Sequence, residues 1–302
     1  MSKPKKPQTD VDNCLLNKYY QILESLGEGT YGLVSKAIDK KTKNFVAIKK
    51  IKIDVESEGL PCSSLREISA LSDLKHPNIV TLLNIYNTGK TLYLVFEYCD
   101  DDLQKFIKRS QGDIPLELIK TILVQLIKAL SYCHSHRTFH RDIKPGNIFM
   151  NKDGTVKLGD FGLARVFRSE AKHYTPEVIS LWYRAPEILF KMPSYTSAVD
   201  MWSVGAIFGE LVLKRPMFKG TSERDQIIKI VEVLGIPTQH EWGNGYSYFS
   251  DIHVQQSGED LNTTFQRVGV SGIELLKSML VYNPNNRVTA ANALTHQFLQ
   301  VK

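Results

Sequence analysis

The sequence predicts an α+β protein with a small β-rich N-terminal lobe and a larger, mainly α-helical C-terminal lobe. Two patterns lead to this prediction. Between residues 44 and 53 apolar side chains alternate with a period of two, which is typical of a strand. After Pro115, apolar residues recur at helical spacing up to Leu130, which is typical of a long helix with one buried face. A chain of 302 residues is long enough to form both lobes.

The strands of the N-terminal lobe are expected in two groups. Residues 19–53 contain three strand-like segments. Residues 81–86 and 91–98 predict two more strands, because residues 88–90 between them are typical of a hairpin turn. Between the two groups, residues 59–74 predict a helix that follows a Gly-Leu-Pro sequence.

The C-terminal lobe is expected to consist mainly of helices. Beyond the long helix after Pro115, helical patterns occupy residues 197–213, 222–234, 271–281 and 289–294. Residues 237–270 contain Gly243, Gly245 and Gly258 and show little periodicity, so they predict a loop-rich insert.

Three parts of the chain are therefore expected. Residues 1–18 predict a flexible N-terminal extension, residues 19–98 the N-terminal lobe and residues 99–299 the C-terminal lobe.

Composition indicates a globular protein of a reducing compartment. The chain is 42% hydrophobic and 23% charged, which is typical of globular proteins. Its four cysteines are scattered without a CxxC pair, which favours free thiols and a location in the cytoplasm, the nucleus or both. The lysines near the N-terminus precede no apolar stretch, so no signal peptide is predicted. The most hydrophobic helix, Met201–Leu213, is too short to span a membrane, and no membrane association is predicted.

The formal net charge of +6 does not by itself indicate a nucleic-acid-binding protein. No basic run has interleaved aromatic residues, and no cysteine–histidine spacing matches a zinc finger. The short basic stretch at residues 3–7 predicts a solvated tail rather than a targeting signal. No nucleic-acid partner is therefore expected.

The first functional motif is a glycine-rich segment, in which Gly27, Gly29 and Gly32 precede Val34. The same glycines occur in dinucleotide-binding turns, but such a turn runs from a strand into a helix. Here a strand-like run follows, so a β-hairpin that covers phosphate groups is the better interpretation. Glycines at these positions let the backbone approach phosphate oxygens closely.

Lys49 lies in the middle of an apolar strand, in the sequence Val-Ala-Ile-Lys. A charged residue in such a strand is unfavourable unless it is paired, and Glu67 on the following helix is the predicted partner. The pair would hold the ammonium group against the α- and β-phosphates of a nucleotide. A lysine that only solubilises an edge strand is the alternative interpretation.

The most specific stretch of the chain is His-Arg-Asp-Ile-Lys-Pro-Gly-Asn at residues 140–147. It matches the catalytic-loop pattern of protein kinases, and the roles that follow are those of the general kinase template. Asp142 would accept the proton of a substrate hydroxyl, Lys144 would neutralise the transferring phosphoryl group, and Asn147 would ligate magnesium. His140 is interpreted as a packed structural residue. His134 and His136 are expected only to favour the negative end of the helix dipole.

Two further motifs follow in the order that protein kinases require. Asp-Phe-Gly at residues 160–162 would supply Asp160 as the principal magnesium ligand. Ala-Pro-Glu at residues 185–187 closes the segment. Either tripeptide alone carries little weight, but their order after the catalytic loop predicts a complete phosphotransfer site.

With these residues identified, the chain resembles the cyclin-dependent kinase family from about Tyr19 to Phe298. Residues 61–67 are similar to the PSTAIRE helix that contacts cyclin, although Cys62, Ser64 and Leu65 depart from it. Residues 162–165 and 174–184 resemble the activation segment of that family. The resemblance implies the two-lobed protein kinase fold and a Ser/Thr protein kinase that uses ATP and magnesium and acts on Ser/Thr-Pro sites in cell-cycle control.

The resemblance also implies regulation by a partner and by phosphorylation. Thr175 matches the activating phosphothreonine, and Arg66, Arg141 and Arg165 match the three arginines that would bind its phosphate. A cyclin-type activating subunit would contact residues 61–70 and the activation segment, and an upstream kinase would modify Thr175.

Further correspondences concern inhibition and substrate choice. Thr30 and Tyr31 match an inhibitory phosphorylation pair, and their remaining unmodified is the alternative. Ser180 matches the hydroxyl that bridges the catalytic aspartate and lysine, which implies Ser/Thr substrates. Val178, Ile179 and Arg184 match the pocket that accepts proline after the target residue.

The resemblance implies a nucleotide site and three structural residues. The matching nucleotide positions are Leu26, Val34, Ala47, Lys49, Val80, Phe96, Glu97, Cys99, Asp102 and Asn147. Backbone groups of Glu97 and Cys99 would contact adenine. Glu187 and Arg287 match a structural ion pair, and Asp200 matches a residue that supports the catalytic loop.

The sequence departs from the family at three positions. Phe149 replaces the leucine usual beneath adenine, Gly159 replaces an alanine before Asp160, and Pro176 follows Thr175. Because Thr175 then lies in a Thr-Pro sequence, a proline-directed kinase is expected to be able to modify it.

Three alternatives stay open on the sequence. A mitogen-activated kinase would carry Thr-x-Tyr, whereas Tyr174 and Thr175 are adjacent in the opposite order. A weak or inactive scaffold of the same fold normally lacks one of four residues that are all present here, namely Lys49, Asp142, Asn147 and Asp160. A dinucleotide-binding oxidoreductase accounts for the glycines alone.

Overall fold

The computed structural model describes residues 16–29, 32–52, 74–88, 91–161, 181–192, 195–252, 254 and 258–300. These residues form two compact units. The N-terminal unit contains the described residues up to Lys75 together with Ile79–Cys99, and the C-terminal unit contains His76–Asn78 and the described residues from Asp100 onward.

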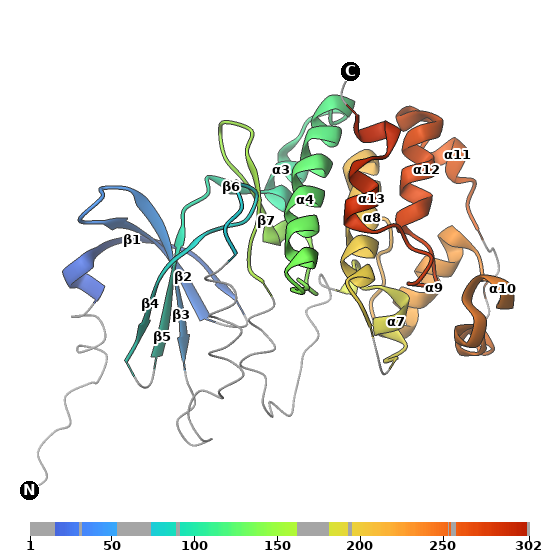
Figure 1. The fold of residues 1–302 in the computed structure, drawn as a ribbon, viewed down its shortest axis with the longest axis horizontal. Helices are drawn as coiled ribbons and strands as arrows, with labels where there is room; N and C mark the ends of the chain where they lie inside the picture. Colours follow the sequence, from blue (N-terminus) through green and yellow to red (C-terminus); the bar gives the residue numbers. More distant parts are fainter. Residues whose placement is uncertain are drawn as a thin grey trace, which may run out of the picture. The chain divides into compact units, whose positions relative to one another are not determined.

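The described part of the N-terminal unit is a five-stranded sheet, in which every neighbouring pair is antiparallel (Figure 1). Its strands are β1 (Tyr20–Gly29), β2 (Gly32–Asp39), β3 (Phe45–Lys52), β4 (Leu82–Asn87) and β5 (Thr91–Glu97). Their order across the sheet is β1-β2-β3-β5-β4. The predicted strands of this lobe are therefore confirmed. The helix predicted at residues 59–74 lies almost entirely outside the described residues.

The two faces of this sheet carry different residues, as the alternation in β3 predicts. Val46 and Ile48 belong to a buried cluster that also contains Tyr20, Ala37 and Val95. On the opposite face, a smaller buried cluster contains the following residues: Ile51, Leu92 and Leu94. Burial of apolar side chains on both faces favours this sheet over an isolated hairpin.

The folded N-terminal unit begins before the expected boundary at Tyr19. Leu16 is 4% exposed and belongs to the same buried cluster as Tyr20 and Ile48. The residues from Leu16 to Tyr19 form a helical turn. The predicted boundary at residue 18 misses this apolar contact because one leucine produces no periodic pattern.

The C-terminal unit begins with a small antiparallel sheet that was not predicted. Its strands are β6 (Asp101–Asp102), β7 (Ile148–Met150) and β8 (Val156–Leu158), in the order β6-β7-β8. Each strand is two or three residues long, which is too short for an alternating pattern to be recognised.

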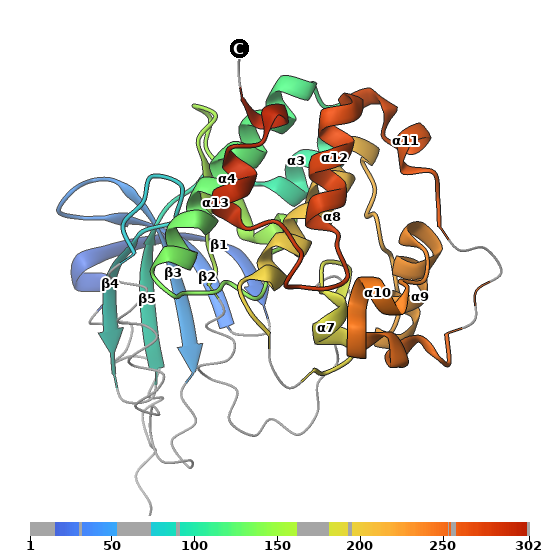
Figure 2. The same ribbon diagram turned by 45° about the vertical axis from the view of Figure 1, so that its right-hand side comes forward.

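Helices make up most of the rest of the C-terminal unit's described part. Their bounds are α3 Leu103–Arg109, α4 Leu116–Ser135, α7 Pro186–Leu189, α8 Ala198–Leu213, α9 Glu223–Leu234, α12 Gly269–Met279 and α13 Ala290–Leu294. Helix α13 lies beside α4, and α12 lies beside α8 (Figures 1 and 2). The helices predicted at residues 197–213, 222–234, 271–281 and 289–294 are confirmed within two residues at each end, and the long helix after Pro115 is confirmed and extends to Ser135. No helix in the described ranges is long and apolar enough to cross a membrane.

The prediction of a loop-rich insert at residues 237–270 is wrong for much of its length. The described part contains four short helical segments: α10 Gln239–Trp242, η2 Gly243–Phe249, α11 Leu261–Thr264 and η3 Gln266–Val268. Thr238 and Glu241 cap α10 reciprocally, and the Asp260 side chain accepts a bond from the backbone of α11. Segments of three to seven residues complete too few turns to show helical periodicity.

Candidate active site

The centre of the candidate site is a group of three polar side chains in the loop at residues 142–147. The Lys144 ammonium lies 3.2 Å from Oδ2 of Asp142. The Asn147 amide Nδ2 donates to the same Oδ2 at 3.1 Å and to the Asp142 backbone oxygen at 2.8 Å. Because Asn147 is only 4% exposed, the Asp142 carboxylate is held by a buried amide on one side and a cation on the other.

The backbone of this loop is joined to the segment that carries Asp160. Residues Pro145–Asn147 form a 3-10 turn, and the Asn147 N–H donates to the Lys144 oxygen at 2.9 Å. The Gly159 N–H donates to the Asn147 oxygen at 3.0 Å, which places Asp160 one residue from this bond. Asp160 has a φ of 56°, in the left-handed region that non-glycine residues rarely adopt.

A buried carboxylate stabilises the backbone that leads into this loop. Asp200, on α8, is 1% exposed and accepts backbone bonds from His140 at 3.0 Å and from Arg141 at 2.9 Å. The bond to Arg141 holds its backbone at a φ of 68°. The predicted supporting role of Asp200 is confirmed. His134 also contacts Asp200, with Nε2 to Oδ2 at 2.9 Å, so the prediction that His134 needs no further role is wrong.

His140 packs inside the C-terminal unit, as predicted. It is fully buried, its Nε2 lies 2.9 Å from the Gly159 oxygen, and its ring centroid lies 4.7 Å from that of Phe161. Its Nδ1 accepts a bond from the Asp142 N–H at 3.3 Å. The imidazole therefore connects the two motifs through packing and hydrogen bonds.

The glycine-rich segment is a β-hairpin. Strands β1 and β2 pair up to Gly29 and Gly32, so a strand follows the glycines and the dinucleotide-binding alternative is excluded. Gly32 has a φ of 133°, and a Cβ at this position would lie 1.8 Å from the Lys50 oxygen. Gly27 has no neighbour within 4 Å of its Cβ position among the described residues. Packing therefore requires a glycine at position 32. At position 27 the described residues leave room for a side chain.

The pairing of the strands places several predicted nucleotide-binding residues on one face of the N-terminal sheet. Gly27, Val34, Lys49 and Leu94 are cross-strand partners in a single row. In antiparallel strands, direct partners share a face, and so do residues two apart in one strand. Ala47 and its partner Phe96 therefore lie on the same face as Lys49. Lys49 is 8% exposed, which excludes the interpretation of a solubilising edge lysine.

The remaining predicted residues of the N-terminal unit lie at or near the strand ends. Leu26, on β1, is 41% exposed. Glu97 ends β5, and its side chain accepts bonds from the Thr81 N–H at 2.7 Å and the Thr81 hydroxyl at 2.8 Å. The Glu97 N–H donates to the Thr81 oxygen at 3.0 Å. Cys99 is partly buried and is not in a disulfide.

Two predicted nucleotide-binding residues belong to the C-terminal unit and face each other across strands. Asp102 is the register partner of Phe149. The Asp102 carboxylate caps α3 by accepting a bond from the Lys105 N–H at 2.8 Å, and it pairs with the Lys105 ammonium at 3.0 Å. Asp102 therefore has a structural role that the sequence did not suggest.

The structure distributes the predicted site residues as follows. Asp142, Lys144 and Asn147 meet in one loop of the C-terminal unit, with Asp160 on the joined segment. Val34, Ala47, Lys49 and Phe96 share one sheet face of the N-terminal unit. The following positions lie outside the described residues: Thr30, Tyr31, Glu67, Ser180, the arginines Arg66 and Arg165, and Thr175 with its neighbours.

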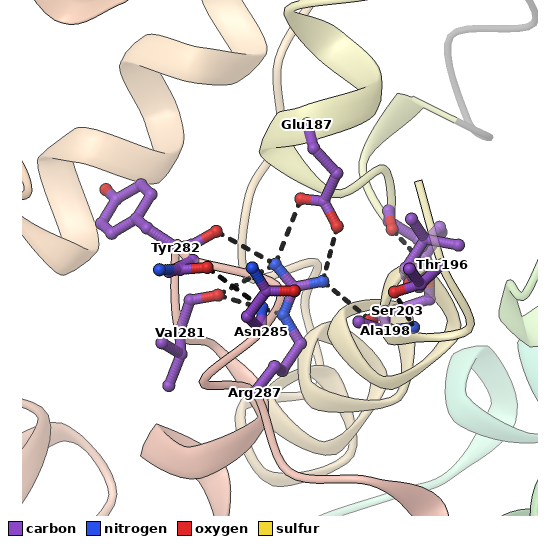
Figure 3. A network of polar contacts seen from close by, with 11 residues as sticks. Glu187, Thr196, Ala198, Ser203, Val281, Tyr282, Asn285 and Arg287 are labelled. Carbon is purple, nitrogen blue, oxygen red and sulfur yellow. Dashed lines mark hydrogen bonds and ion pairs between the residues drawn. The ribbon is translucent and has the colours of Figure 1, made fainter. Parts of the chain in front are cut away.

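A buried ion pair within the C-terminal unit joins Glu187 of α7 to Arg287. The Arg287 guanidinium binds both oxygens of the Glu187 carboxylate, at 2.8 and 3.1 Å, and both side chains are buried (Figure 3). The same guanidinium donates to the carbonyl oxygens of Ala198, Val281 and Tyr282. This pair was predicted, and the structure confirms it.

Two aromatic residues near the loop were not predicted. The Arg141 guanidinium carbon lies 5.9 Å from the ring centroid of Phe139 and 5.6 Å from that of Tyr195. Both distances are within the range of cation–π contacts. No sequence signal connects Arg141 with Tyr195, because more than fifty residues separate them.

A comparison with known protein families agrees with this geometry. A family model described as the protein kinase domain matches residues 20–299. The matched range includes the glycine hairpin, Lys49, the loop around Asp142 and the Glu187–Arg287 pair. The five-stranded sheet followed by a helical region is the two-lobed fold of that family. This chain therefore belongs to the protein kinase family.

Proposed function

We propose that this protein kinase is a Ser/Thr kinase of the cyclin-dependent type, which transfers the γ-phosphate of ATP to Ser or Thr followed by Pro. One observation supports the transfer step: the Asp142 carboxylate is held between Lys144 and Asn147. The Ser/Thr-Pro specificity, a role in cell-cycle control and a location in cytoplasm or nucleus rest on the resemblance of the sequence to that family.

In the proposed mechanism, Asp142 orients the substrate hydroxyl and accepts its proton as the oxygen attacks the γ-phosphorus of ATP, while the bond from that phosphorus to the β,γ-bridging oxygen breaks and ADP leaves. Lys144 and Asn147 both engage Oδ2 of Asp142, so we assign proton acceptance to Oδ1. The Lys144 ammonium compensates negative charge on the transferring phosphoryl group. Ser180 would bridge Asp142 and Lys144 in this mechanism.

The donor atoms fit magnesium bound with a nucleotide. Magnesium in such sites takes one or two protein oxygen ligands and completes its shell with phosphate oxygens and water. Nδ2 of Asn147 is used in its bonds to Asp142, which leaves Oδ1 as the ligand atom, and the Asp160 carboxylate would be the second ligand. No group of three or more His, Cys, Asp or Glu side chains in the described ranges is arranged to hold a metal. The ion would supply charge stabilisation for the phosphates.

The N-terminal unit would supply the nucleotide-binding groups. Gly27 and Gly29 in the hairpin would let backbone N–H groups approach the phosphates. Lys49 would contact the α- and β-phosphates, with Glu67 as its partner on the helix predicted after this strand. Ala47 and Phe96, on the same sheet face as Lys49, would line the adenine pocket.

The proposal includes regulation by two inputs. A cyclin-type subunit would contact residues 61–70 and the activation segment, and so set the Lys49–Glu67 pair. An upstream kinase would phosphorylate Thr175, whose dianionic phosphate would then bind Arg66, Arg141 and Arg165. Because Pro176 follows Thr175, a proline-directed kinase, including this one, could act as the upstream enzyme.

The test compares Asp142→Asn with Asp251→Asn, an exposed control aspartate. Purified protein is assayed with a Ser-Pro peptide, its Ser-Ala counterpart and a Tyr peptide, with and without a co-purified partner. We expect Asp142→Asn to lower kcat by about 10²–10⁴-fold and the control to retain activity. Unchanged turnover in Asp142→Asn would contradict the proposed mechanism. Equal rates on Ser-Pro and Ser-Ala peptides would remove proline direction alone, and equal rates without the partner would remove cyclin dependence alone.

A further inference from the structure

A cavity of about 370 Å³ opens on the N-terminal unit away from the predicted nucleotide face. It is lined by Lys18, Tyr19, Tyr20, Asp39, Lys40, Lys41, Asn84 and Tyr86. Asn84 is paired in register with Val95, which is paired with Ile48, and Ile48 points to the opposite face of β3 from Lys49. The cavity is therefore separate from the row that contains Lys49.

Hydroxyl groups and an amide form the polar interior of this cavity. The Tyr20 and Tyr86 hydroxyl oxygens lie 3.4 Å apart, and the Asn84 amide donates to the Tyr20 hydroxyl at 2.9 Å. Burial, with the hydrogen bond to Tyr20, raises the pKa of Tyr86 above its usual value. Tyr86 is therefore a neutral hydrogen-bond donor at physiological pH.

Aromatic rings provide a second recognition surface. The rings of Tyr19 and Tyr86 are stacked with centroids 6.0 Å apart, and Tyr20 meets Tyr86 edge to face at the same distance. Tyr19 is 43% exposed, so part of its ring is accessible to a ligand. An aromatic body can stack on such a surface with little conformational change.

The rim of the cavity is strongly basic. Lys18, Lys40 and Lys41 are all exposed, and the ammonium of Lys18 lies 5.4 Å from the Tyr19 ring centroid. Among the described residues that line the cavity, Asp39 is the one acidic residue, and its Oδ1 accepts bonds from the backbone of the following turn at Lys41 and Thr42. The rim thus carries three ammonium groups and one carboxylate that is already hydrogen-bonded to the backbone. This excess of positive charge favours a ligand with two negative charges.

We propose that this cavity binds a phosphate monoester attached to an aromatic ring, as in phosphotyrosine. The lysines would neutralise the dianionic phosphate, the Tyr86 hydroxyl would accept its bond from Tyr20 and donate to a phosphate oxygen, and the ring would stack on Tyr19. The cavity is large enough for a ring as well as a phosphate group. Binding in this cavity does not require phosphate transfer. The test of this proposal is therefore independent of the test of the proposed function.

The experiment titrates the full chain with phenyl phosphate, inorganic phosphate and phenol by isothermal titration calorimetry. We expect phenyl phosphate to bind at least about tenfold more tightly than either fragment. The double variant Lys40→Gln, Lys41→Gln is expected to weaken phenyl phosphate binding by about tenfold or more, because it removes two of three rim charges. The matched control, Lys52→Gln with Lys75→Gln, removes two charges of the same unit that do not line the cavity and is expected to leave the affinity unchanged.

Two further titrations, with a phosphotyrosine peptide and with free phosphotyrosine, identify the source of the ligand. A phosphotyrosine peptide that binds more tightly than free phosphotyrosine would assign the cavity to a phosphorylated protein segment, and equal affinity would assign it to a small aromatic phosphate. Absence of phenyl phosphate binding at 10 mM, on the order of the weakest specific affinities, would overturn the proposal. Equal affinities of the cavity variant and the control variant would overturn it as well, and inorganic phosphate binding as tightly as phenyl phosphate would overturn the aromatic part. Kinase activity and thermal unfolding of each variant show that it is folded.

Discussion

The guanidinium of Arg141 lies 5.6 Å from the ring centroid of Tyr195, and its backbone N–H is bound by Asp200. The residue that follows it, Asp142, is the proposed catalytic base. The aromatic contact and the Asp200 bond therefore fix both the side chain and the backbone of Arg141. If Arg141 binds phosphate on Thr175, Tyr195 positions the cation for that interaction.

Replacing Tyr195 tests this positioning. Tyr195→Ala removes the ring, and we expect it to reduce the stimulation of activity by Thr175 phosphorylation by about two- to fivefold, the value of an exposed cation–π contact. Tyr195→Phe keeps the ring and should retain the stimulation. Peptide phosphorylation by phosphorylated and unphosphorylated enzyme is the measurement. An equal loss of activity in both phosphorylation states would indicate a structural role instead.

Breaking the Glu187–Arg287 pair should cost far more stability than breaking an exposed pair. Glu187→Gln leaves the buried Arg287 charge without its carboxylate, and we expect the free energy of unfolding to fall by about 3–5 kcal/mol. The control is Glu232→Gln, which breaks the Lys229–Glu232 pair at the surface and should cost at most about 1 kcal/mol. Urea unfolding of the three proteins provides the comparison. Similar losses for both variants would contradict the assignment.

The two glycines of the hairpin should respond differently to alanine. Gly32→Ala places a Cβ against the Lys50 oxygen in a backbone conformation with φ of 133°, so we expect a loss of stability of about 1–3 kcal/mol or more. Gly27→Ala meets open space, and its stability should change by less than about 0.5 kcal/mol. Because Gly27 is proposed to lie against phosphates, its variant should instead raise the KM for ATP. Thermal unfolding and nucleotide kinetics separate the two effects.

Stability should also depend on the ionisation of Glu210 in α8. This side chain is 6% exposed and accepts a bond from the Tyr183 hydroxyl at 2.6 Å. Burial raises the pKa of Glu210 above its usual value of 4.5, although the bond from Tyr183 and the charge of Lys108 oppose the shift. Above pH 4.5 the unfolded chain loses this proton before the folded protein does, so the contribution of Glu210 to stability is lost as the pH rises to the folded pKa.

Comparison with Glu210→Gln isolates this contribution. The free energy of unfolding of the wild type, relative to that of Glu210→Gln, should fall as the pH rises from 4.5 toward neutrality. Glu117→Gln, which changes an exposed carboxylate on α4, serves as the control for replacing a carboxylate by an amide. Denaturant unfolding at a series of pH values measures the difference. A relative stability that stays constant or rises with pH would contradict the assignment.

Several features could be predicted from the sequence because they depend on residues close together in the chain. The catalytic-loop residues Asp142, Lys144 and Asn147 lie within six positions, so their spacing alone indicates the motif that the structure folds into one hydrogen-bonded loop. The alternation in β3 likewise predicts that Lys49 and Ile48 point to opposite faces. Helices with several turns were predicted for the same reason, since periodicity accumulates along them.

Other features depend on contacts that no local pattern encodes. The small sheet β6-β7-β8 joins residues almost fifty positions apart, and its strands are too short to show alternation. The short helices of residues 237–270 are held by caps and by aromatic packing of Trp242 and Phe249 on Phe190 and Tyr282. The assignment of the individual site residues to nucleotide, metal and substrate stays a prediction.

The sequence by itself determined the protein kinase family and predicted the chemical groups of a phosphotransfer site, because both depend on short runs of residues with fixed spacing. Only the tertiary structure decided how those groups are held. Asp200 supports the loop from a helix some sixty residues away, as the bonds to His140 and Arg141 show. Tyr195 and the lysine-rimmed cavity around Tyr86 likewise arise from the packing of distant segments. Long-range contacts of this kind depend on how the elements pack against each other, and a single sequence does not display that packing.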